Sequence, residues 1–369
     1  MYRLLGLLAV VAAVLFVGCS DSTTTPDDTL QIPTTYDSTN WTVNTADQYM
    51  IRSKVSELLT LIKTARKQEV TITRDQLFAI YNTIETYVNP ADRDRLRGFI
   101  EAAAVASGNA YDWNASPSAN GNGGVYNGQL FDMYGRDLVE FQEKGLFTSL
   151  FYYQAMLLMK GEVTPAVVDQ IVALFGANPS FPNGSTTAAQ RDAFAAGYAA
   201  RRDKNDGNGF YSQFKKAALK ARAAAANPAK YGAQLTSALQ DMCVVWERSM
   251  MATAVNYAYA TITTLTASEL DDAKRAGALH TYGECAGITE GWQVVNSTDR
   301  VMPHSTLLQL LAMLRIPYQT TPECYLLWQQ TAANIQSLED YTKQVQVVYG
   351  FTDAEMTDFK SNWVTLQGR

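Results

Sequence analysis

Apolar side chains recur at three- and four-residue steps through most of the chain, and this helical period is the strongest constraint on its fold. Early in the chain the repeat falls on Met50, Val55, Leu58, Leu59 and Ile62. The short EVTIT at 69–73 is the strongest β-like segment, and no longer run alternates apolar and polar residues. The pattern therefore predicts an all-α fold of about ten to twelve helices in antiparallel bundles.

Capping signals divide this periodic sequence into separate helices. Asn44 is expected to cap the first helix, and Thr73 with Gln76 forms a capping-box pattern before the second. Thr164-Pro165 and Thr321-Pro322 each pair a capping residue with proline at the first helical position. These signals predict helix starts at four points along the chain, the last one opening a helix that runs to about Val348.

A polar segment at 109–128, rich in Asn, Gly, Ser and Pro, separates the first helices from the centre of the chain. We expect it to be a loop that is either functional or an excursion. Residues 129–161 follow as one helical stretch, apolar nearly all round from Leu146 to Met159, which predicts a central position in the core. Two helical lobes are expected, near 44–175 and near 210–366.

The N-terminal residues MYRLLGLLAVVAAVLFVGCS predict export and lipidation. Arg3 precedes an apolar run, Leu4 to Val17, that is short for a membrane-spanning helix. Gly18-Cys19 after this run resembles a bacterial lipobox, whose lipoproteins are cleaved before the cysteine and lipidated on it. We expect a signal peptide at 1–18 and a lipid on Cys19. The alternative is a plain signal peptide or anchor with an incidental cysteine.

Polar residues dominate 19–31, so this segment is expected to be a disordered tether between the lipid and a folded region at 32–369. The formal charge is −6 and no long basic run occurs, which argues against nucleic acid as a partner. The expected location is the bacterial cell envelope, on the periplasmic or surface face of the outer membrane, with the lipid as the membrane contact.

Three further cysteines lie in the last third of the chain: Cys243, Cys285 and Cys324. In an oxidising compartment an odd number permits one disulfide and one free thiol. The alternative is three buried free thiols, and the sequence does not distinguish the two.

One of the two histidines lies in GALHTYGECAGITEGWQ, residues 277–293. On a helix, His280 and Glu284 share a face, and an imidazole with a carboxylate can ligate zinc or iron. Glu247 is the candidate third ligand, because an unpaired carboxylate among apolar residues is costly. The alternative is a core histidine that is hydrogen-bonded to one of these glutamates. His304, in contrast, is expected to be exposed at a helix start.

The order of these features resembles a known group of proteins. The lipoprotein start, IPTTYDSTNWTVNTADQYMIRSKVSELLTLI, QEKGLFTSLFYYQA, VVWERSMMATAVNYA and the His280 segment are similar to an uncharacterised family of bacterial lipoproteins related to the imelysin-like proteins. The resemblance covers nearly all of 31–366. It implies an all-helical fold of two bundle-like lobes and a link to iron or haem uptake.

The imelysin-like marker Gly-x-His-x-x-Glu corresponds to Gly277, His280 and Glu284 in this chain. Here the histidine comes three residues after the glycine instead of two, and the glutamate four after the histidine instead of three. The resemblance thus implies a metal role for His280 first and for Glu284 second.

Three hypotheses of function follow. The first is a membrane-anchored, non-enzymatic lipoprotein associated with iron or haem uptake, which binds iron, haem or zinc through His280, Glu284 and Glu247. The second is a metal-free surface or periplasmic protein that binds another envelope protein or a polysaccharide. The third, a metal-dependent hydrolase, is disfavoured because no second histidine lies near His280 in the sequence. The enzyme motifs GxSxG, HExxH, Walker and GxGxxG are also absent from the sequence.

Overall fold

The computed structural model describes residues 29–114, 117, 121–184, 187 and 190–369. The predicted signal peptide at 1–18, the predicted lipidation site Cys19 and residues 19–28 of the predicted tether lie outside the described residues. By its internal contacts the chain divides into Met1–Gln31 and one compact unit, Ile32–Arg369. Within the described ranges, no helix has both the length and the apolar character that crossing a membrane requires.

The unit Ile32–Arg369 is mostly helical, with 64% helix and 2% strand, which confirms the helical class predicted from the periodicity. In the described part of the chain there are 15 helices, and 11 of them are at least seven residues long. This count treats the continuous helical stretch 138–159 as one helix. The prediction of ten to twelve helices therefore matches the long helices and misses several short ones.

The first helices are α1 (Trp41–Asn44), α2 (Ala46–Thr64), α3 (Arg74–Tyr81) and α4 (Arg93–Ala106). Thr73 and Gln76 form the predicted capping box at the start of α3. The predicted cap at Asn44 was wrong. Its side-chain amide instead donates a hydrogen bond to Oδ2 of Asp169, at 2.8 Å, and Thr45 separates α1 from α2. Short 3₁₀ turns follow α3 at Glu85–Tyr87 and Pro90–Asp92.

A β-hairpin occupies the end of the segment predicted as a loop and the start of the stretch predicted as helix. Strands β1 (Gly124–Tyr126) and β2 (Gln129–Phe131) pair antiparallel. Asn127 and Gly128 connect them with φ values of 43° and 79°. Two positive φ angles define the turn that Asn-Gly favours in tight hairpins. The predictions of loop to residue 128 and helix from 129 were therefore both wrong at this point.

The central helix comprises α5 (Leu138–Leu146), a π-helical segment (Phe147–Tyr152) and α6 (Tyr153–Met159). All six side chains of the π-helical segment are buried, as predicted for the apolar stretch. The wider turn releases backbone groups from the α-helical pattern. One of them, the carbonyl of Ser149, accepts a hydrogen bond from the backbone N–H of Asn89 at 2.7 Å.

The next helices are α7 (Pro165–Phe175), α8 (Phe194–Arg201), α9 (Phe210–Ala225), α10 (Pro228–Leu265) and α11 (Asp272–Gly291). Thr164 and Pro165 start α7 as predicted, and Gly176 ends it in the left-handed conformation. The longest of these helices, α10, packs extensively against both α9 and α11. Two 3₁₀ turns, Trp292–Val294 and Ser297–Asp299, continue from α11.

The last helices are α12 (His304–Met313), α13 (Leu326–Gln329), α14 (Thr331–Tyr349), α15 (Asp353–Asp358) and α16 (Trp363–Gln367). The predicted end of a helix near Val348 agrees with the end of α14, but the prediction that Thr321-Pro322 opens this helix was wrong. The backbone N–H groups of Glu323 and Tyr325 donate to the carbonyls of Arg315 and Tyr134, which holds this segment outside a helix.

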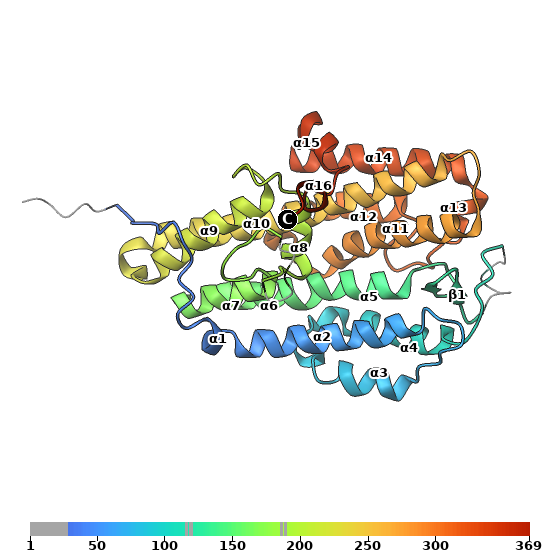
Figure 1. The fold of residues 1–369 in the computed structure, drawn as a ribbon, viewed down its shortest axis with the longest axis horizontal. Coiled ribbons are helices and arrows are strands. Elements are labelled where there is room, and N and C mark those ends of the chain that lie inside the picture. Colours follow the sequence, from blue (N-terminus) through green and yellow to red (C-terminus); the bar gives the residue numbers. More distant parts are fainter. Residues whose placement is uncertain (1–28, 115–116, 118–120, 185–186, 188–189) are drawn as a thin grey trace, which may run out of the picture. The chain divides into compact units, whose positions relative to one another are not determined.

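Figure 1 shows how the helices of this unit are layered. The green stretch α5–α6–α7 lies between the blue helix α2 and the pair α10–α11, and α14 packs on α10. Because α5 belongs to the predicted lobe 44–175 and α11 to the predicted lobe 210–366, their contact joins the two ranges. The boundary between the two lobes stays a prediction.

Candidate functional site

Three glycines on one face of α11 allow this helix to approach α5 closely. A Cβ atom added at Gly283, Gly287 or Gly291 would come within 2.9, 3.1 and 2.9 Å, respectively, of atoms in the facing stretch 137–148. Their spacing of four residues places them on the same side of the helix. The close approach brings His280 and Glu284 of α11 against the polar side chains of α5.

Asp137 connects the two helices through its carboxylate. Oδ1 accepts the backbone N–H groups of Val139 and Glu140, at 3.1 and 3.3 Å, and so caps the N-terminus of α5. Oδ2 lies 3.0 Å from Nδ1 of His280. The Asp137 side chain is fully buried, whereas the His280 side chain is 25% exposed. The histidine is thus fixed by a residue that is itself held by the helix start.

Lys144 lies seven residues after Asp137, about two turns along α5, and is fully buried. Its Nζ is 3.0 Å from Oε2 of Glu140, 3.1 Å from Oε2 of Glu143 and 2.6 Å from Oε2 of Glu284. It also donates to the hydroxyl of Tyr198 on α8, at 2.8 Å. A single ammonium group therefore joins three carboxylates from both helices.

Arg66, in the turn that follows α2, closes the other side of this polar layer. Its Nη2 lies 2.8 Å from Oε1 of Glu140 and 3.8 Å from Oδ1 of Asp137. The layer as a whole contains four carboxylates and three cationic or protonatable groups: Asp137, Glu140, Glu143, Glu284, Arg66, Lys144 and His280. We refer to these seven residues as the polar layer.

The polar layer shifts the pKa values of its members in opposite directions. Burial favours the neutral form of Glu140, but the charges of Lys144 and His280 outweigh it and lower the pKa of Glu140 to about 2. Glu284 behaves in the opposite way, because burial and the nearby carboxylates outweigh Lys144 and raise its pKa to about 7. Burial alone would lower the pKa of His280, yet the hydrogen bond to Asp137 and the surrounding carboxylates raise it.

Asp137, Glu140 and His280 also bring together three atoms that could hold a metal ion, all within 4.8 Å of one another. Nδ1 of His280 is 3.0 Å from Oδ2 of Asp137 and 3.7 Å from Oε1 of Glu140. A tetrahedral ion bound at about 2.0–2.2 Å has its ligands roughly 3.4 Å apart. The donor types therefore suit zinc or ferrous iron, and the two distances from Nδ1 of His280 bracket the required spacing.

Two of the three predicted site residues lie together, and one does not. Nε2 of His280 is 3.9 Å from Oε1 of Glu284, as expected for residues four apart on a helix. The structure does not bring Glu247, the predicted third ligand, to this pair. Thr261 on α10 contacts Thr281 beside the histidine, and Glu247 is fourteen residues before Thr261, about 21 Å along the helix.

Glu247 has a different environment, in which its charge is satisfied by three donors. The backbone N–H groups of Val301 and Met302 lie 2.6 and 2.9 Å from its carboxylate oxygens, and the hydroxyl of Tyr349 lies 2.7 Å away. This carboxylate fastens the segment after α11 and the end of α14 to α10. The second histidine, His304, is exposed at the first residue of α12, as predicted.

The sequence reasoning missed the partners on α5, namely Asp137, Glu140 and Lys144. A signal was present, because Asp137 followed by Glu140 has the spacing of a capping pair at a helix start. Reading 129–161 as one helix concealed this start. No local pattern indicates that Lys144 is buried, since its three carboxylate partners come from two different helices.

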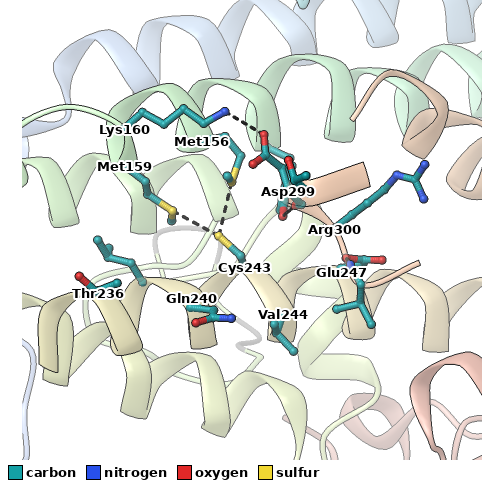
Figure 2. A pocket seen from close by; sticks show the side chains of 14 residues that line it. Met156, Met159, Lys160, Thr236, Gln240, Cys243, Val244, Glu247, Asp299 and Arg300 are labelled. Atoms are coloured by element: carbon teal, nitrogen blue, oxygen red, sulfur yellow. Dashed lines mark hydrogen bonds and ion pairs between the residues drawn. The ribbon is translucent and has the colours of Figure 1, made fainter. Parts of the chain in front are cut away.

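All three described cysteines are free thiols, which corresponds to the alternative without a disulfide. Cys285 and Cys324 are buried, whereas Cys243 is half-buried and lines a cavity of about 500 Å³ between α6 and α10. Figure 2 shows Cys243 pointing toward Met156 and Met159 in this cavity.

Comparison with known proteins adds no relative to these observations: no family model, no curated protein and no solved structure matches the chain.

Proposed function

We propose that this chain is a lipid-anchored, non-enzymatic protein of the bacterial envelope that binds a first-row divalent metal ion at Asp137, Glu140 and His280, in the context of iron uptake. The observation that carries the proposal is the convergence of one imidazole nitrogen and two carboxylate oxygens within 4.8 Å. Nitrogen and oxygen donors of this kind suit zinc and ferrous iron.

Binding would have to displace existing interactions, which makes the proposal specific. Arg66 already contacts Oε1 of Glu140, at 2.8 Å, and must move if that oxygen becomes a ligand. A protonated His280 must also lose the proton on Nδ1 before this nitrogen can coordinate. We therefore expect each bound ion to release a proton and to bind more tightly as the pH rises.

Haem is a weaker candidate than a free ion at this position. His280 lines none of the five main cavities among the described residues. Both of its ring nitrogens have carboxylate neighbours, Asp137 at Nδ1 and Glu284 at Nε2. An axial haem ligand needs a free nitrogen that faces an apolar cavity.

A second candidate function is a metal-free interaction protein, in which the polar layer only fixes the packing of α5 on α11. The specific observation in its favour is Lys144, whose ammonium group already forms ion pairs with three carboxylates without any metal ion. A buried layer of ion pairs can select one helix register, which is a structural role.

Metal titration by calorimetry distinguishes the two candidates. The wild type should bind about one Zn²⁺ or Fe²⁺ per chain, and His280→Ala should lower the affinity at least tenfold. Asp137→Asn should also lower the affinity while it preserves the helix cap, because asparagine caps helices as well as aspartate does. The matched control is His304→Ala, which removes the other histidine and should bind as the wild type does.

Equal binding, or no binding, by the wild type and His280→Ala would contradict the metal proposal and leave the metal-free candidate. The membrane anchor is tested separately in cells that express the full chain. Cys19→Ser should release the protein from the membrane fraction, and continued retention would contradict lipidation at this residue.

A further inference from the structure

Three sulfur atoms from two helices meet in the cavity between α6 and α10. Sγ of Cys243 lies 3.5 Å from Sδ of Met156 and 3.3 Å from Sδ of Met159 (Figure 2). The two methionines are three residues apart on α6, so their side chains leave the same face of that helix. We call these three residues the sulfur cluster.

The sulfur cluster is accessible from a cavity and is not part of the closed core. Each of the three residues is half-buried, and all three line a space of about 500 Å³. At the edge of this space, Nζ of Lys160 forms an ion pair with Oδ2 of Asp299 at 2.8 Å. The Lys160 side chain is 58% exposed, so this pair lies where the cavity meets solvent.

We infer that the sulfur cluster is a binding site for a soft monovalent metal ion, copper(I) in the first place, with Cys243 as thiolate ligand and Met156 and Met159 as thioether ligands. Thiolate sulfur is a good ligand for copper(I), zinc and iron alike. Thioether sulfur is a soft, neutral ligand, so two methionines beside one cysteine favour copper(I). Neither histidine lines this cavity, and its two carboxylates, Glu247 and Asp299, already have hydrogen-bond or ion-pair partners. The three sulfurs are therefore its distinctive donors.

The distances fit this ion after a small adjustment. With metal–sulfur bonds of about 2.3 Å, three sulfurs in a trigonal plane lie roughly 4 Å apart. The two observed sulfur pairs must therefore separate by about half an ångström, which the flexible methionine side chains can do. Burial raises the pKa of the Cys243 thiol to about 12, so the free site holds a proton. Binding replaces the S–H bond by an S–Cu bond and releases that proton, with no change in oxidation state.

This inference does not rest on the proposed function, because the two sites share no residue. The sulfur cluster belongs to α6 and α10, whereas the nitrogen and oxygen ligands belong to α5 and α11. His280→Ala should consequently leave copper(I) binding unchanged, and the sulfur variants should leave zinc binding unchanged. Failure of one site is thus distinguishable from failure of the other.

The test is a competition titration under anaerobic, reducing conditions, with copper(I) supplied as its bicinchoninate complex. The wild type should remove one copper(I) ion per chain from the chelator. The double variant Met156→Leu/Met159→Leu should bind at least a hundredfold more weakly, and Cys243→Ser should not compete at all. Leucine conserves the volume of methionine, and Met50→Leu on the exposed side of α2 is the matched control.

The double methionine variant decides the outcome, because it keeps every thiol of the chain. Unchanged copper(I) binding by this variant would mean adventitious binding to thiols and would overturn the inference. The second measurement is X-ray absorption of the wild-type complex, which does not depend on how the variants fold. A coordination shell of three sulfurs supports the site, and a shell of nitrogen or oxygen overturns it.

Discussion

Replacing Lys144 with methionine tests how strongly a buried ammonium group stabilises the contact between α5 and α11. Methionine fills a similar volume without the charge. The ammonium group of Lys144 lies 2.6–3.1 Å from carboxylate oxygens of Glu140, Glu143 and Glu284, and no part of the lysine side chain is exposed. Removing one partner of a buried ion pair costs about 3–5 kcal/mol, because the other charge stays buried. We expect Lys144→Met to lower the free energy of unfolding by that amount at pH 8.

Urea denaturation of the wild type and three variants measures this effect. Lys54→Met is the matched control, since Lys54 forms an exposed ion pair with Glu57 at 2.7 Å and should cost less than about 1 kcal/mol. The double variant Lys144→Met/Glu284→Gln should regain at least about 1 kcal/mol, because it removes one uncompensated carboxylate. The reasoning is refuted if Lys144→Met loses no more free energy of unfolding than Lys54→Met does. It is also refuted if Lys144→Met/Glu284→Gln is less stable than Lys144→Met.

Three further predictions concern stability. Burial is the main cause that raises the pKa of Glu284 from 4.5 to about 7. Between pH 4.5 and about 7, Glu284 is therefore protonated in the folded protein and ionised in the unfolded chain. Stability should therefore fall as the pH rises through this window, and Glu284→Gln should flatten the dependence seen in urea titrations. Glu247→Ala leaves two backbone N–H groups and the hydroxyl of Tyr349 without their acceptor, and thermal unfolding should report a loss of about 2–4 kcal/mol; a gain in stability would contradict this role. Gly287→Ala introduces a Cβ 3.1 Å from a carbonyl of α5 and should cost about 1–3 kcal/mol. The same change at Gly232, which has open space around it, should raise the free energy of unfolding by about 0.5–1 kcal/mol. Stabilisation by alanine at both glycines, or destabilisation at both, would contradict the close approach of α11 to α5.

The sequence is sufficient for the helical class and for most of the long helices. These elements depend on local information, such as the apolar period, the Thr73–Gln76 capping box and the Thr164-Pro165 start. The hairpin was also indicated locally by Asn127-Gly128, but the helical reading of 129–161 took precedence. The segment after Pro322 is different, because bonds to Arg315 and Tyr134 override a local signal for helix.

Only the part of the candidate site that depends on local sequence could be predicted. His280 and Glu284 share a helix face, so their proximity follows from a spacing of four. The candidate ligands Asp137 and Glu140 lie at the start of a helix more than 130 residues earlier, and their approach depends on the glycine face of α11. Glu247 is buried, but its partners were not predicted, since two of them are backbone N–H groups and the third, Tyr349, lies about 100 residues later in the chain.

The π-helical segment Phe147–Tyr152 sets the rotational phase between the two ends of the central helix. A π turn holds one residue more than an α turn, and one residue corresponds to about 100° of rotation. Lys144 on one side of the segment faces α11, while Met156 on the other side faces Cys243 of α10. The central helix thus presents Lys144 to α11 and Met156 to α10. Deletion of one residue from the π-helical segment would rotate one end of the central helix relative to the other by about 100°, so that only one of these two contacts could be kept.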